Sequence, residues 1–116
     1  MSNWIEIIDQ NFQIPLERFA EGIAALGHQQ EYGNELPSAL ENLYWLDTDS
    51  APNGAIEFIG YYGRSSDALD HALERLAPIM EDGSYVAFHG ETTTDFWRIY
   101  YEGGKAYWQT GYLAWK

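Results

Sequence analysis

The sequence has no cysteine and few basic residues: six lysines and arginines stand against eighteen aspartates and glutamates, a net charge of -12 at pH 7. Without cysteine, a disulfide framework, thiolate catalysis and cysteine-ligated zinc are all excluded. We therefore expect a protein of the reducing cytoplasm. The scarcity of bases argues against direct binding of nucleic acid, because lysine and arginine hold the phosphates. A basic partner, either a protein or a nucleoprotein complex, suits this charge better.

Long hydrophobic runs and catalytic motifs are also missing. No apolar stretch approaches the roughly 18 residues of a transmembrane helix, and no basic segment before an apolar one marks a signal peptide. The glycines form no phosphate-binding loop, no serine lies in a nucleophile elbow, and the three histidines lack the spacing of a helical zinc site. We therefore expect no membrane contact, no cofactor, no metal and no enzymatic activity.

The 116 residues, 46% of them hydrophobic, fit one domain spanning residues 1–116. Apolar residues at spacings of three and four predict a helix that begins after Pro15 and ends at Gly27. The mixed apolar pattern of residues 4–12 is interpreted as a short helix before it. Residues 28–38 are rich in helix breakers and are expected to form a surface connection, in which Pro37 can start another helical turn.

A second long helix is predicted from Asp67 onward, capped by Ser65 or Ser66 and ended near Pro78. Its apolar stripe consists of Leu69, Ala72, Leu73, Leu76, Ile79 and Met80.

Aromatic and β-branched runs predict two antiparallel strands before this helix and three after it. The five strands are residues 43–47, 55–62, 84–89, 96–101 and 105–115. With the helices, they give the order α, β, β, α, β, β, β. We therefore predict the α+β class, with an antiparallel sheet of about five strands and helices packed on one of its faces.

The acidic residues are unevenly distributed. Residues 1–49 hold nine acids against one base, whereas the rest of the chain holds nine acids against five bases. An acidic surface of this kind attracts a basic protein over long range, although solubility alone also accounts for an acidic composition. The candidate protein-binding acids are Glu31, Glu35, Glu41, Asp47 and Asp49.

Aromatic residues make up 16% of the chain. Strand propensity and core packing explain most of them, but adjacent aromatics on a strand cannot all face one core. We therefore expect Tyr61, Tyr62, Tyr107, Trp108 and Tyr112 to include surface contacts. The last strand, near Trp108, is also a candidate sheet edge at which a homodimer could form.

One histidine offers an alternative site. His89 and Glu91 are two residues apart at the end of a predicted strand, so their side chains share one side of the sheet. A surface histidine is the simpler interpretation, but a cleft lined by this pair and by aromatic rings would suit a small ligand or an enzyme.

A resemblance covers residues 55–107, through the segments IEFIG, SSDALDHALERLAP, EDGSYVAFHGE and DFWRIYYEGGKAY. These resemble a pattern of strand, helix and glycine hairpin in small uncharacterised bacterial and phage-encoded proteins. The small, acidic, single-domain character is similar to that of phage anti-defence proteins, including anti-CRISPR inhibitors, and of immunity proteins that neutralise basic toxins. The resemblance implies a fold and a class of function, and it carries over no functional residue.

Three hypotheses follow. The first is a non-enzymatic acidic inhibitor, of the anti-CRISPR or immunity kind, that occludes a basic nucleic-acid-binding or toxin surface. The second is a self-associating structural domain that dimerises through the strand near Trp108. The third is a small-ligand binder or enzyme that uses His89 and Glu91.

Overall fold

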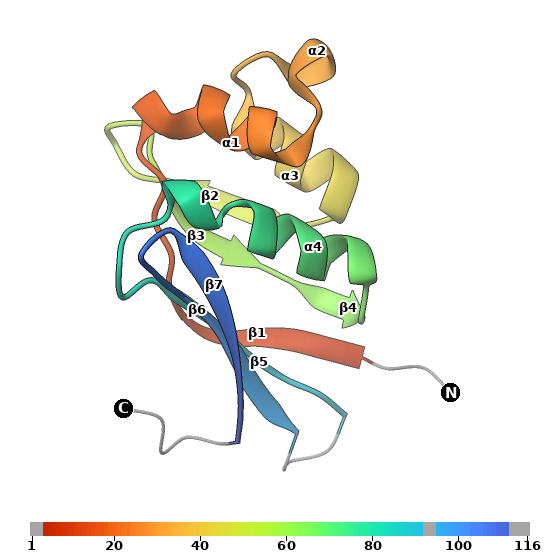
Figure 1. Cartoon of the computed structure of the whole chain (residues 1–116). Helices are drawn as coiled ribbons and strands as arrows, with labels where there is room; N and C mark the ends of the chain where they lie inside the picture. Colours follow the sequence, from red (N-terminus) through yellow and green to blue (C-terminus); the bar gives the residue numbers. More distant parts are fainter. Residues whose placement is uncertain (1–3, 92–94, 112–116) are drawn as a thin grey trace.

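The computed structural model describes residues 4–91 and 95–111 of the chain, and it has the predicted α+β architecture (Figure 1). Five antiparallel strands form a sheet in the order β4-β1-β5-β6-β7, and β2 and β3 form a separate two-stranded sheet. The helices are α1 (Phe19–Leu26), α2 (Gln29–Tyr32), α3 (Leu36–Tyr44) and α4 (Asp67–Arg75), with short 3-10 helices η1 (Leu16–Arg18) and η2 (Ala77–Ile79). The strands are β1 (Trp4–Asn11), β2 (Asp47–Ser50), β3 (Ile56–Gly60), β4 (Tyr62–Arg64), β5 (Tyr85–His89), β6 (Phe96–Glu102) and β7 (Lys105–Gly111).

The helices predicted around α1 and α4 are confirmed. Pro15 precedes η1, which leads into α1, and Gly27 ends α1 in the left-handed conformation at φ 83°. The predicted apolar stripe of α4 and η2 is buried throughout. Pro78 lies in η2, where the chain tightens into a 3-10 turn instead of continuing the α-helix.

Ser66 caps α4: its Oγ accepts a hydrogen bond from the backbone N–H of Leu69 at 3.3 Å. We expect Ser66→Ala to lower the free energy of unfolding by about 1 kcal/mol, because one N–H of the first turn loses its partner. Urea unfolding monitored by circular dichroism measures the change. The neighbouring Ser65→Ala is the control, since Ser65 is exposed and is not the capping residue. Equal losses in the two variants would contradict the assigned cap.

The helix predicted for residues 4–12 is wrong, because this segment is the strand β1. It lies between β4 and β5, with Glu6 opposite both Tyr62 and His89. The register shifts between Ile7 and Asp9, so that apolar residues on either side of this bulge no longer alternate strictly. The mixed apolar pattern of residues 4–12 is therefore that of a bulged strand and not that of a helix.

The first predicted strand is also wrong at its start. Residues 43 and 44 belong to α3, which has Pro37 in its first turn. Its apolar residues recur at helical spacing: Leu36, Ala39, Leu40 and Leu43. The extended segment comes later, as β2, and pairs with β3 outside the main sheet. The predicted connection of residues 28–38 contains the single turn α2 and, from Leu36 onward, the start of α3, so the helical turn expected at Pro37 is present.

The side chain of Gln10 joins the two sheets. Its Oε1 accepts a hydrogen bond from the N–H of Ile59 at 2.9 Å, and its Nε2 donates to the Ile59 carbonyl at 2.6 Å. The backbone N–H of Ile7 donates to the Tyr61 carbonyl at 3.0 Å. The strand β1 is therefore bound along β4 and β5 and, through Gln10, to β3.

The C-terminal strands β5, β6 and β7 form the predicted antiparallel meander. Residues 112–115 of the last predicted strand, and Tyr112 with them, lie outside the described residues. The inner face of the sheet carries Val86 and Phe88 of β5 and Ile99 and Tyr101 of β6, all buried beneath the helices. The sequence left open which face would be buried, and the structure assigns it to these residues.

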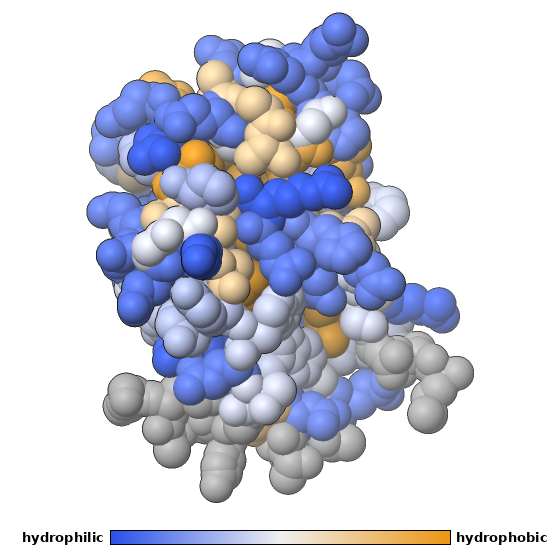
Figure 2. All heavy atoms as spheres, in the orientation of Figure 1, coloured by the Kyte–Doolittle hydropathy of each residue, from blue (hydrophilic) through white to orange (hydrophobic). Residues whose placement is uncertain are grey.

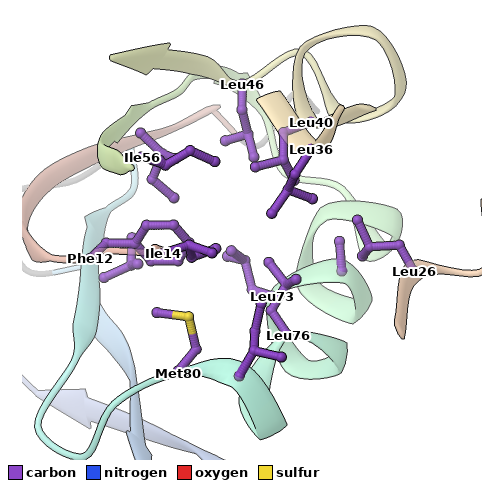
Figure 3. Packing of buried hydrophobic residues seen from close by; sticks show 14 of the residues in the cluster. Phe12, Ile14, Leu26, Leu36, Leu40, Leu46, Ile56, Leu73, Leu76 and Met80 are labelled. Carbon is purple, nitrogen blue, oxygen red and sulfur yellow. The ribbon is translucent and has the colours of Figure 1, made fainter. Parts of the chain in front are cut away.

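The core lies between this face, the β2–β3 sheet and the helices. Figure 3 shows side chains from the segment after β1, from α3 and from α4 pointing into one space. The surface over the helices is mainly hydrophilic, with hydrophobic atoms visible in the seams between elements (Figure 2). Within the described ranges, the helices pack on one face of the five-stranded sheet and leave its other face bare (Figure 1).

Candidate functional site

Three of the five predicted acids, Glu41, Asp47 and Asp49, lie close together in the chain where α3 leads into β2. Glu41 lies in the last turn of α3, and its Oε2 accepts a hydrogen bond from Thr48 Oγ1 at 2.6 Å. Asp47 and Asp49 alternate with Thr48 along β2, opposite Gly60 and Phe58 of β3, so their side chains point to the other side of the strand from Thr48. All three acids are exposed, and none takes part in the ion pairs found among the described residues.

The other two predicted acids lie elsewhere. Glu31 is on α2, where its Oε1 lies 2.7 Å from His28 Nδ1. Glu35 precedes α3 at its opposite end, about 13 Å along the helix axis from the α3–β2 junction. Both are exposed, but the structure does not place them in the group formed by Glu41, Asp47 and Asp49.

Trp45 lies between these acids in the chain, and it was not among the predicted site residues. Its side chain is 77% exposed, more than any other large hydrophobic side chain that the structure describes. Its backbone has φ 55° and ψ 32°, and it is the one non-glycine residue with positive φ in residues 4–91 and 95–111. Glycine is the residue favoured at such a helix end. We call Glu41, Trp45, Asp47 and Asp49 the Trp45 corner.

Backbone hydrogen bonds hold the corner in place. The N–H of Trp45 donates to the Glu41 carbonyl at 3.1 Å, and the N–H of the buried Leu46 donates to the Leu40 carbonyl at 3.3 Å. Burial raises the pKa of the neighbouring Tyr44 hydroxyl, and the charge of Arg75 on α4 opposes this in part. The residues on both sides of Trp45 therefore pack inward, while its indole extends into solvent.

The predicted tyrosines have different roles. Tyr61 is half-buried against the core, and its hydroxyl donates to the Arg64 carbonyl at 2.6 Å. Tyr62 is 73% exposed on β4, and its ring stacks on that of Trp4 with centroids 5.7 Å apart. Tyr61 is thus a structural residue, whereas Tyr62 is free to contact a ligand or a partner.

Trp108 is on the predicted edge strand, since β7 ends the five-stranded sheet. Its indole N–H donates to Glu74 Oε2 on α4 at 2.8 Å, and 40% of the side chain is exposed. The ring is therefore bound to the helix layer of its own molecule. A homodimer at this edge stays a prediction, and it would use the β7 backbone more readily than the indole.

The bare face of the sheet is rich in aromatic rings. Tyr100 and Tyr107 stack with centroids 5.3 Å apart, and the Arg98 guanidinium lies 5.2 Å from the Tyr100 centroid and 5.5 Å from that of Tyr85. The Tyr85 hydroxyl donates to Asp9 Oδ2 at 3.0 Å. The pKa of the Tyr85 hydroxyl is raised, mainly because the group is partly removed from water and secondly because of this hydrogen bond.

A hollow of about 390 Å³ lies near one end of this face. It is lined by Trp4, Glu6, Tyr62, His89, Gly90 and Glu91. The predicted pair His89 and Glu91 thus does line a cleft with aromatic rings, but the hydrogen-bond partner of His89 is Glu6, with Nε2 and Oε1 3.0 Å apart. Glu6 was missed because residues 4–12 were predicted to be a helix.

The described residues do not gather perturbed acids and bases in one cleft. Tyr44, Asp70, Tyr85 and Tyr101 have clearly raised pKa values, with burial the largest cause in each case, and they lie on α3, α4, β5 and β6. No group of three or more potential metal-ligating side chains occurs in the part of the chain that the structure describes.

Among the described residues, no helix has both the length and the apolar character required to cross a bilayer. Comparison with known proteins adds no assignment: no family model, curated protein or solved structure matches the chain.

Proposed function

We propose that this is a non-enzymatic binding protein that docks on a basic protein surface through the Trp45 corner and occludes it. The observation that carries the proposal is the exposed Trp45 in a left-handed conformation, with three exposed acids within four residues of it in the chain. Tryptophan is enriched among the residues that dominate binding energy at protein interfaces. An exposed apolar ring on a strained backbone contributes little to the stability of the fold. A role in binding explains why tryptophan occupies this position.

Charge supports the same kind of partner. Carboxylates form short, charge-assisted hydrogen bonds with arginine and lysine, the residues with which proteins hold phosphates. An indole next to those carboxylates adds a surface on which a guanidinium can stack. A nucleic-acid-binding protein or a basic toxin presents such side chains, and an inhibitor of the anti-CRISPR or immunity kind would act by covering them. The protein's net charge would also speed the encounter.

Neutralising the corner tests this proposal. We expect Glu41→Gln, Asp47→Asn and Asp49→Asn together to weaken binding of a captured basic protein by about tenfold for each carboxylate that contacts it. Capture from a host lysate at low and high salt, followed by titration with the recovered partner, measures the loss.

The matched control replaces Glu17, Glu81 and Glu102 with glutamine, which removes the same charge from η1, the η2–β5 turn and β6. This control is expected to keep most of the affinity. Equal losses in the two triple variants would mean that net charge alone drives binding, and this would contradict the proposed surface. Recovery of only the protein itself would favour self-association at β7.

A further inference from the structure

The hollow on the bare face of the sheet has an aromatic wall. Trp4 of β1 and Tyr62 of β4 are 42% and 73% exposed, and their rings stack at an interplanar angle of 28°. Packing against the core does not explain this pair, because Trp4 and Tyr62 lie on the face away from the helices. The two rings present a π surface to whatever enters the hollow.

The other walls carry negative charge. Glu6 and Glu91 both line the hollow, and Glu6 Oε1 lies 3.0 Å from His89 Nε2. An adjoining hollow of about 250 Å³ shares Trp4, Gly90 and Glu91 with the first and adds Asp95. Gly90 allows Asp95 to approach, since a Cβ at residue 90 would lie 3.1 Å from the Asp95 Cβ. Two carboxylates, Glu6 and Glu91, thus line the hollow with both rings, and a third, Asp95, lines the adjoining hollow with Trp4.

We propose that this hollow binds a small organic cation of the quaternary ammonium class. Aromatic faces attract such cations through the ring quadrupole, and carboxylates attract them through charge. The volume of the hollow is within the range typical of small-ligand sites. Arg64 lies opposite Trp4 in the strand register but is outside the lining of the hollow. The proposal does not depend on the Trp45 corner, which contributes no residue to the hollow.

The direct test is a titration of the whole chain with choline and with its neutral isostere dimethylbutanol, in which carbon replaces the nitrogen. We expect choline to shift the indole N–H resonance of Trp4 in a saturable way, with an affinity at least about fivefold higher than that of the isostere. The two ligands have nearly the same shape, so the difference reports charge alone. Trp4→Phe assigns the resonance.

Variants locate the site. Tyr62→Ala and Glu91→Gln are each expected to weaken choline binding about threefold or more, and both residues are exposed, so the fold should tolerate the changes. Tyr107→Ala is the matched aromatic control, because Tyr107 is an exposed ring on the same face that stacks on Tyr100 away from the hollow. Trp45→Gly should also leave choline binding unchanged.

Equal affinity for the isostere would overturn the proposal, because the hollow would then be an apolar surface without preference for a cation. The absence of any saturable shift at millimolar choline would overturn it too, as would unchanged binding in Tyr62→Ala. Each of these results leaves the Trp45 corner untouched, so the two proposals succeed or fail separately.

Discussion

Trp45→Gly is expected to raise the free energy of unfolding by about 1 kcal/mol while it removes partner binding. At φ 55° the Cβ of any L-residue is strained, and glycine relieves that strain. Little burial is lost, because Trp45 is 77% exposed. Most large-to-small substitutions destabilise a protein, so a gain in stability would be a distinctive result. Urea unfolding measures it, and capture from a lysate measures binding.

Gly27→Ala is the matched control for the backbone argument. Gly27 ends α1 at φ 83°, and beyond its own turn of helix and its chain neighbours, no described residue comes within 4 Å of the position that a Cβ would take. We therefore expect this substitution to lower the free energy of unfolding by about 1 kcal/mol, solely because alanine is strained at a positive φ. If Trp45→Gly also lowered stability, the indole would have a structural role, and the explanation of its exposure as a binding feature would be wrong.

Tyr101→Phe should cost about 2 kcal/mol at neutral pH. Tyr101 is fully buried on β6, and its hydroxyl donates to the Leu73 carbonyl of α4 at 2.8 Å. Phenylalanine keeps the ring but leaves that carbonyl without this donor in the interior. Equilibrium unfolding in urea at pH 7 gives the difference. An unchanged midpoint would contradict the assigned link between the sheet and α4.

The same residue makes stability depend on alkaline pH. Burial, with a smaller contribution from the charge of Glu74, raises the pKa of Tyr101 well above its ordinary value of 10. The folded state therefore holds the phenolic proton after the unfolded chain has released it. This stabilisation is complete below pH 10 and falls by about 1.4 kcal/mol per pH unit above it.

Tyr101→Phe lacks this ionisation, so its stability should fall less steeply above pH 10. The gap between wild type and variant is expected to narrow as the pH rises from 10 to 11, and urea unfolding across that range measures it. A constant gap would mean that the hydroxyl is not protected from ionisation in the folded state.

Elements with local signals were predictable from the sequence. The Ser66 cap and the regular apolar stripe define α4, and the glycine turn at residues 103–104 defines the β6–β7 hairpin. The strand β1 was not predictable in this way. Its bulge disturbs the alternation, and its hydrogen-bond partners on β4 and β5 lie far along the chain.

The candidate sites also contain some features that local sequence signals predict and others that depend on the folded structure. The exposure of Glu41, Asp47 and Asp49 followed from composition and turn signals, but the exposure of Trp45 between them depends on where α3 ends. The run of Tyr44, Trp45 and Leu46 has the composition of a strand. The sequence therefore did not indicate that Trp45 lies at the end of a helix with an exposed side chain. The Glu6–His89 contact joins residues 83 positions apart, and only the pairing of β1 with β5 brings them together.

The most direct test of the binding surface compares wild type and Trp45→Gly side by side as bait in one lysate, with captured proteins quantified by mass spectrometry. The account predicts a basic, nucleic-acid-binding or toxin-like protein that is enriched on the wild type, released at high salt and absent from the equally folded variant. The same captured proteins on both baits, in equal amounts, would contradict it.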